Sequence, residues 1–584
     1  MSFRAAGDVA ARGSFDAGGA SSPEKDQASA IVTPSILENN GSQGTPSYSE
    51  MDEDEAQLKK LGYKPILHRS FALFESFAAT FAALDVVGGV RLTMATGISF
   101  AGPASYWSSF VITAVCSIIT AAVLAEVCSA LPASGSIYLW AAESGGKVFG
   151  RFLSFLVAWW STTAWTTFVA SMCQSTMNFV FAEVSVFNGS YKTDVSDVKF
   201  RAVQWITSEV VLLFVILLNY VPPRLYKLLF RISMAIIAID YILNIVWVPI
   251  ATSKKDYGFR SAKWVFTQTY YNYAGTMDDA GTKPVPKGWQ WCLTYFATAG
   301  ILCGYDASGH IAEETKNASV KAARGLFWST VVSAVCAFSL IIMFLFCMPP
   351  DTTFFDLIYS ATSTQPVVNL YAYMLGRGGH VVMNVICIIE LFMNAVVSVL
   401  ACSRLVFAVA RDGVLPFSSW IGQVDKNGQP RNAITVIYIC SCILLCSILP
   451  SNVAFTSLVS AAGAPSFAAY TLIAFGRLFL SRNNFPKGKW DLGILKKPFY
   501  FVAMIFNAFA FIVNVSPYSY PVKASNFNYA IVIMAIVSIC AVLCTIFIPR
   551  SKWLATRSPQ DGYVVPHGPQ ESPVQVNEKG QWEK

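Results

Sequence analysis

Charged residues are scarce in this sequence of 584 residues. They account for 13% of the chain, whereas hydrophobic residues account for 54% and the mean hydropathy is +0.48. Soluble domains carry about 25% charged residues. Several apolar runs reach about 20 residues, which is enough to cross a bilayer core of about 30 Å. The scarcity of charge excludes an ordinary soluble protein and predicts an all-α polytopic membrane protein.

Motifs of catalysis and of ATP-driven pumping are missing as well. The chain has four histidines, no H-E-x-x-H motif and no G-x-x-x-x-G-K-S/T phosphate loop. Its 14 cysteines lie mostly inside apolar runs and lack zinc-type spacing, as expected of small buried apolar residues. We therefore expect a protein that is not an enzyme and that has no cofactor or metal. We assign the net charge of +7 to cytoplasmic loops and not to nucleic-acid binding.

The two ends of the chain lack long apolar runs. The first 50 residues are rich in Ser, Gly and Ala and contain no apolar core of a secretory signal peptide. The C-terminal end is polar and contains several prolines. Such segments bury too little apolar surface to fold. We predict disordered cytoplasmic tails at 1–69 and 551–584 around a transmembrane domain at 70–550.

Between the tails, the apolar runs predict twelve transmembrane helices, and glycines interrupt the first and the sixth. The expected spans are 71–100, 106–131, 150–182, 202–220, 225–250, 289–313, 323–348, 380–410, 432–449, 453–480, 498–516 and 526–548. With the N-terminus in the cytoplasm, the inner segments carry more Lys and Arg than the outer ones, so both termini are expected to be cytoplasmic. This orientation places the sequon at Asn188 outside, as a candidate glycosylation site.

The two interrupted spans point to a binding site. In the first span Asp85 is followed by Gly88, Gly89 and Arg91, and the sixth span is broken at Gly304-Tyr305-Asp306. Unwinding a helix in the bilayer frees backbone N–H and C=O groups that need partners, and a bound polar ligand can provide them. Glycines also serve close helix packing. A charge beside both breaks, five helices apart, favours a ligand site.

Charged residues inside spans are costly and tend to be functional. Asp85 and Arg91 either pair with each other or serve the ligand, with Arg91 attracting a carboxylate. Asp240 and Glu390 lie deeper in their spans, as a buried polar pair or as a proton relay. The candidates for proton coupling are Asp85, Asp306, Asp240 and Glu390. Trp165 of the third span could line the site or simply pack.

Several motifs carry a family resemblance. The segments LAEVCSALPASGSIYLWAA (124–142), GYDASGHIAEETKNA (304–318) and SRLVFAVARDGVLP (403–416) resemble the amino acid/choline permease branch of the amino acid–polyamine–organocation superfamily, with weaker support from FGRLFL (475–480). This branch includes fungal GABA permeases. The segment TGISFAGP (96–103) resembles the GABA-permease pattern. The resemblance covers roughly residues 60–550.

The resemblance implies a leucine-transporter-like fold. Two inverted repeats of five helices would occupy about 71–250 and 289–480, followed by two extra helices at about 498–548. It also implies secondary transport by alternating access, with a proton as coupling ion. The substrate would bind between the broken spans, with walls from the third and eighth spans. Carried over by position, the binding segments include Gly88 and Gly89 in the first break and Gly304, Tyr305, Asp306 and Ala307 in the second.

An Asp and an Arg beside the first break depart from this family pattern and suit a zwitterionic or carboxylate-bearing substrate. We therefore predict proton-driven symport of an amino acid or a GABA-like compound. The alternatives are a choline or polyamine carrier and a nutrient sensor that has lost transport. The expected partners are a small-molecule substrate and the lipid bilayer, with the plasma membrane favoured over the vacuolar membrane.

Overall fold

The structure is a computed structural model. It describes residues 58, 61–63, 67, 69–187, 193–270, 283–358, 364–376, 378–426, 428–450, 452–481, 485–517, 519–523 and 527–554. Most of the two predicted tails and the sequon at Asn188 lie outside these residues. The described residues all belong to one compact unit that begins at Asp52. At its ends, Tyr63 and Leu554 are buried.

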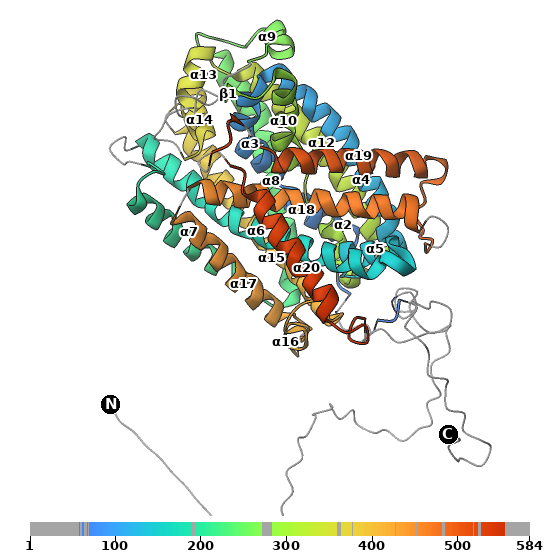
Figure 1. Cartoon of the computed structure of the whole chain (residues 1–584). Helices are drawn as coiled ribbons and strands as arrows, with labels where there is room; N and C mark the ends of the chain where they lie inside the picture. Colours follow the sequence, from blue (N-terminus) through green and yellow to red (C-terminus); the bar gives the residue numbers. More distant parts are fainter. Residues whose placement is uncertain are drawn as a thin grey trace, which may run out of the picture. The chain divides into compact units, whose positions relative to one another are not determined.

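The described chain is built almost entirely of helices, which confirms the all-α prediction (Figure 1). The long helices are α2 (Leu73–Leu84), α3 (Val86–Ala101), α4 (Pro103–Ala130), α6 (Gly146–Phe187), α7 (Val198–Leu218), α8 (Tyr226–Ser253), α10 (Lys287–Ile301), α12 (Ala318–Cys347), α15 (Gly379–Arg411), α17 (Arg431–Leu445), α18 (Asn452–Phe475), α19 (Lys496–Val515) and α20 (Ala530–Phe547). The short helices are α5 (Ser136–Ser144), α9 (Ala262–Thr267), α11 (Ala307–His310), α13 (Asp351–Ile358), α14 (Pro366–Leu375) and α16 (Ser418–Ile421). The strands β1 (Lys283–Pro284) and β2 (Ser519–Tyr520) form one antiparallel pair.

Each of the twelve expected spans is helical, and most of their ends lie within a few residues of the predicted ones. Ten helices in the described part of the chain are long and apolar enough to cross a membrane. The two expected spans outside this set are α6, which is rich in Trp, Ser and Thr, and α10, which ends after 15 residues. The third and sixth spans therefore carry the least lipid-like sequences, as helices at a polar interior would.

Both predicted breaks occur. Asp85 separates α2 from α3 and has a left-handed backbone with φ 41°. Five residues, 302–306, separate α10 from α11, and Gly304 has φ +104°. Left-handed backbone is rare outside glycine, so both positions are specialised turns and not frayed helix ends.

The broken helices lie inside the bundle. In α2–α3, 78% of the most apolar stretch is buried, and in α15 it is 72%, against 22% in the helix that includes α8 and 17% in α20. The helix α3 packs on α10, α6 packs on both α15 and α18, and α2 packs on α12. The exposed faces of α7, α8 and α20 are apolar, as lipid-facing surfaces must be. The fold thus gathers both breaks at the centre of the bundle.

The contact between α12 and α2 depends on a glycine. A Cβ atom on Gly325 would lie 2.6 Å from Ser76 Oγ and 3.0 Å from the backbone nitrogen of Phe77. We expect Gly325→Ala to destabilise the protein by about 1–3 kcal/mol through overpacking. This loss should exceed the gain in helix propensity of about 1 kcal/mol. The measurement is the unfolding temperature of the purified protein in detergent.

The matched control is Gly300→Ala in α10, because no atom lies within 4 Å of a Cβ placed there. Its unfolding temperature should stay the same or rise. Equal unfolding temperatures for the two variants would contradict a close contact at Gly325.

Candidate functional site

The break in the sixth span is held by side chains of neighbouring helices. The backbone nitrogen of Ser308 donates to Thr80 Oγ1 of α2 at 3.0 Å. The hydroxyl of Ser308 donates to the carbonyl of Ala322 in α12 at 2.9 Å and also contacts Ser76 Oγ. A Cβ on Gly309 would lie 2.7 Å from the ring of Trp140, so α11 fits closely against α5. The short helix after the break is therefore fixed on three sides.

Asp306 lies at this break, surrounded by hydrogen-bond donors. The Tyr470 hydroxyl of α18 donates to Oδ1 at 2.6 Å, and Trp165 Nε1 of α6 donates to Oδ2 at 3.3 Å. His310 Nε2 lies 3.0 Å from Oδ2. Each of these side chains is almost completely buried. Donors on both oxygens favour the ionised carboxylate, so the break holds a buried negative charge.

Aromatic rings surround this carboxylate. Tyr305 stacks on Tyr470, with ring centroids 5.0 Å apart and an interplanar angle of 22°. Trp165 meets His310 edge-on at 5.3 Å. The other ring nitrogen of His310, Nδ1, lies 2.5 Å from Ser136 Oγ of α5. A buried carboxylate within an aromatic shell can bind a cation that also presents flat rings.

The glycines of the first break have separate functions. Asp85 Oδ1 accepts from the backbone nitrogen of Gly88 at 3.3 Å, and a Cβ on Gly88 would lie 2.6 Å from Asp85 Oδ2. Gly88 therefore makes room for the Asp85 carboxyl group. Gly89 faces α10, and a Cβ there would lie 3.6 Å from the Cα of Ile301. At the end of α2, the carbonyl of Ala83 accepts from Asn394 Nδ2 of α15 at 3.4 Å.

Arg91 is engaged by other side chains of the protein. Its Nη2 forms an ion pair with Asp240 Oδ1 of α8, and its Nη1 lies 3.7 Å from Glu390 Oε2 of α15. Its Nε donates to the Tyr371 hydroxyl of α14 at 2.9 Å. The Arg91 side chain is 0% exposed. Among the described residues its ion pairs are with Asp240 and Glu390, and not with Asp85.

The candidate residues thus fall into two groups. One contains Trp165 and the segment 304–307, which Tyr470, Ser136 and His310 complete. The other contains Asp85, Arg91, Asp240 and Glu390, completed by Tyr371. Sequence reasoning missed Tyr470, Ser136 and Tyr371. Each is an uncharged residue in an apolar or loop segment, and only its contacts mark it.

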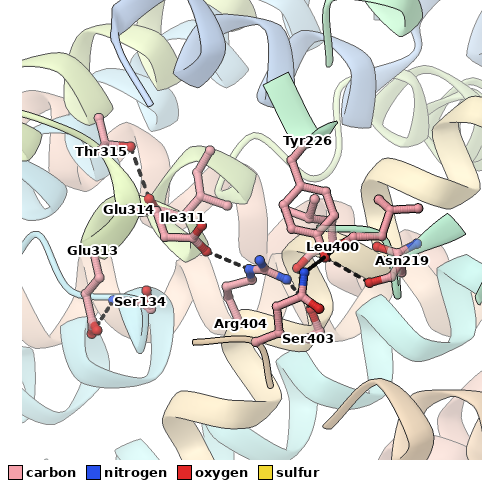
Figure 2. A network of polar contacts seen from close by, with 12 residues as sticks. Ser134, Asn219, Tyr226, Ile311, Glu313, Glu314, Thr315, Leu400, Ser403 and Arg404 are labelled. Atoms are coloured by element: carbon pink, nitrogen blue, oxygen red, sulfur yellow. Dashed lines mark hydrogen bonds and ion pairs between the residues drawn. The ribbon is translucent and has the colours of Figure 1, made fainter. Parts of the chain in front are cut away.

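A third polar network lies where the motif 304–318 meets the end of α15 (Figure 2). Glu314 Oε1 accepts from Arg404 Nε at 2.7 Å, and the Arg404 guanidinium lies 5.0 Å from the ring centre of Tyr226. Glu313 accepts from Arg411 at 3.0 and 3.1 Å and from the backbone nitrogen of Ser134 at 2.9 Å. These ion pairs join the broken span to α5 and α15. They close this end of the bundle, which the predicted orientation places on the cytoplasmic side.

The Arg404–Glu314 pair is buried, with side-chain exposures of 1% and 4%. Removing Arg404 would leave an uncompensated buried carboxylate, so Arg404→Ala should lower the free energy of unfolding by about 3–5 kcal/mol. The unfolding temperature in detergent measures this. The matched control is Arg431→Ala, because the Arg431–Asp425 pair is 49% and 21% exposed. An exposed pair contributes about 0–1 kcal/mol. Similar losses in both variants would contradict the buried pairing of Arg404.

Comparisons with known proteins identify the family. Residues 72–537 match the family described as "Amino acid permease". The chain is 67% identical over 521 residues to the protein named "Thiamine transporter thi9" of Schizosaccharomyces pombe, covering 88% of each chain. It is 27% identical over 491 residues to "Amino-acid permease BAT1 homolog" of Oryza sativa subsp. japonica, covering 82% of this chain and 90% of the relative. It is 24% identical over 498 residues to "Amino-acid permease BAT1" of Arabidopsis thaliana, covering 83% and 92%.

The 67% identity to a thiamine transporter contradicts our predicted function. An amino acid or GABA-like substrate was wrong, and the choline, polyamine and sensor alternatives are abandoned with it. The physical reason lies in Arg91, whose charge suggested a carboxylated substrate but is taken up by Asp240 and Glu390. The protein is an integral, multi-pass membrane transporter and not an enzyme. It belongs to the amino acid permease family of the amino acid–polyamine–organocation superfamily.

Proposed function

We propose that this permease transports thiamine. The observation that carries the proposal is the 67% identity to a thiamine transporter over 88% of both chains. The aligned part is long enough to include both broken spans and the helices that pack on them. The more distant relatives, at 24% and 27% identity, are named amino-acid permeases, so family membership alone would not select thiamine.

The chemistry of thiamine fits the site around Asp306. Thiamine has a permanently positive thiazolium ring, a flat aminopyrimidine ring and a hydroxyl group, and it has no carboxylate. The Asp306 carboxylate offers a counter-charge, and the rings of Trp165, Tyr305 and Tyr470 offer stacking and cation–π surfaces. We infer that Asp306 and these rings, with the backbone of Gly304 and Ala307, form the binding site.

The engagement of Arg91 agrees with a cationic substrate. A guanidinium facing the site would repel thiamine. The Arg91 side chain is fully buried against Asp240, Glu390 and Tyr371, so its charge is compensated within the protein. We therefore assign Arg91 to the framework of the first span, and the remaining candidate contacts near the first break to Gly88, Gly89 and Asp85.

We infer that the fold contains two inverted repeats, comprising α2–α8 and α10–α18, followed by α19 and α20. A two-fold relation would bring each helix near its counterpart in the other repeat. The pairs α3–α10, α4–α12, α6–α15 and α7–α17 are in contact, which supports this relation (Figure 1). Transport would then proceed by alternating access, and one step would separate the ion pairs of Arg404 and Arg411. The cytoplasmic termini and the plasma membrane stay predictions.

Uptake of labelled thiamine tests the proposal. The full chain is expressed in cells that lack their own thiamine uptake, and we expect saturable uptake that exceeds that of empty-vector cells. A pyridinium analogue of thiamine should compete, because it keeps the positive ring. Uncharged thiochrome should compete poorly. GABA, glutamate, choline and putrescine serve as controls and should have no effect. Expression at the cell surface without thiamine uptake would contradict the proposal.

Substitution of Asp306 tests the site. Asp306→Asn keeps the shape but removes the charge, and a charge-assisted contact contributes about 1.5–3 kcal/mol, or about 10–100-fold in affinity. We expect the KM for thiamine to rise by about this factor. Tyr470→Phe removes one hydroxyl that contacts Asp306 and should raise the KM less. The control is Tyr438→Phe on α17, which should leave the KM unchanged. Unchanged KM values in all three variants would place the site elsewhere.

A further inference from the structure

A second charged cluster lies apart from Asp306, at the break of the first span. It contains Asp85 between α2 and α3, Arg91 of α3, Asp240 of α8 and Glu390 of α15. All four are at most 2% exposed. The Arg91 guanidinium pairs with Asp240 through Nη2 and lies 3.7 Å from Glu390 Oε2 through Nη1. Four segments distant in sequence therefore meet at one buried group of charges.

The charges of this cluster do not balance. Three carboxyl groups face one guanidinium, so full ionisation would leave two excess negative charges away from water. Burial of an uncompensated charge is strongly unfavourable, and such groups neutralise instead. The other titratable groups facing the cluster, Tyr371 of α14 and Cys387 of α15, carry no positive charge. The cluster therefore needs one or two additional positive charges.

The hydrogen bonds show where the deficit lies. Asp240 Oδ1 accepts from Arg91 and from Asn244 Nδ2, the latter at 3.0 Å. Asp85 Oδ2 and both oxygens of Glu390 find no donor among the described residues. The carboxyl groups of Asp85 and Glu390 adjoin one another. Two carboxylates in contact repel, whereas a proton between them provides both the missing charge and the missing donor.

A metal ion is a poorer solution here. In the described part of the chain, no group of three or more His, Cys, Asp or Glu side chains has an arrangement that could hold a metal ion. Asp306 also differs from the pair, because Tyr470, Trp165 and His310 surround both of its oxygens. The unsatisfied carboxyl oxygens of the first break therefore mark a site for a proton and not for a metal.

We propose that Asp85 and Glu390 form a proton-binding site that shares one proton between their carboxyl groups. Asp85 caps the first turn of α3 through the backbone nitrogen of Gly88, and Glu390 belongs to α15. Loss of the proton leaves two adjoining carboxylates, which separates α3 from α15. Gain of the proton brings the two together. The proton comes from solution on one side of the membrane and leaves to the other.

This site deepens the proposed function, on which it rests, by assigning the step that couples transport to a proton gradient. A proton that moves down a gradient of one pH unit releases about 1.4 kcal/mol, which is about tenfold in substrate concentration. Purified protein in liposomes can separate this coupling from transport itself. Thiamine counterflow needs no gradient, whereas accumulation needs one. The membrane potential is clamped at zero with potassium and valinomycin, because thiamine is itself a cation.

In wild-type liposomes we expect thiamine counterflow, and about tenfold accumulation under an inward gradient of one pH unit. Glu390→Gln and Asp85→Asn should keep counterflow and lose accumulation. The control is Glu209→Gln on α7, a carboxyl group that accepts from Trp205 Nε1 at 3.2 Å away from the cluster. It should accumulate thiamine like the wild type. Full accumulation by both cluster variants would overturn the proposal.

The failure of each proposal looks different in this assay. Absence of counterflow in the wild type would refute thiamine transport. Counterflow without any response of the wild type to the proton gradient would refute the proton site alone and leave thiamine transport standing.

Infrared spectroscopy of the wild type provides a test that does not depend on the folding of a variant. A shared proton predicts the carbonyl band of a protonated carboxylic acid at neutral pH, shifted in D2O. The band should be weakened in Glu390→Gln and in Asp85→Asn but kept in Glu209→Gln. Its absence from the wild type, or its full persistence in both cluster variants, would overturn the assignment.

Discussion

The need to satisfy broken backbone inside a membrane governs the centre of this protein. Two helices stop and restart where no water or lipid can bind their N–H and C=O groups. Side chains do this instead: Asp85 binds Gly88 N, Asn394 binds Ala83 O, and Thr80 binds Ser308 N. These partners come from α2, α15 and the first break itself. The breaks therefore dictate which helices lie against them, and the polar centre follows.

The two aspartates at the breaks illustrate how surroundings separate identical groups. Asp306 is surrounded by a tyrosine, a tryptophan and a histidine, so its charge is stabilised. Asp85 meets another carboxyl group, and one of its oxygens has no donor among the described residues. The first arrangement suits a constant counter-charge for a cation. The second suits a proton that is bound and released. One fold can thus keep substrate binding and coupling at different breaks.

Arg91 shows how a charge in a sequence can mislead. Beside a helix break, a lone arginine suggests an anionic substrate, and an amino acid was the natural inference. Its guanidinium instead reaches Asp240 and Glu390, which lie 149 and 299 positions further along the chain. A cationic substrate such as thiamine is then compatible with the same residues. The partner of a buried charge decides its meaning, and the partner is a property of the fold.

By itself the sequence determined the membrane class, the helices and the places where two of them break, because apolar length, glycine and mid-span charge act locally along the chain. It also pointed to Asp85, Arg91, Asp240, Glu390 and Asp306, since charges are rare in apolar helices. It could not reveal Tyr470, Ser136 or Tyr371, whose composition resembles that of their surroundings. Nor could it distinguish the two carboxylate environments. Those depend on contacts between distant helices, and only the tertiary packing, driven by the burial of broken backbone and unpaired charge, decided them.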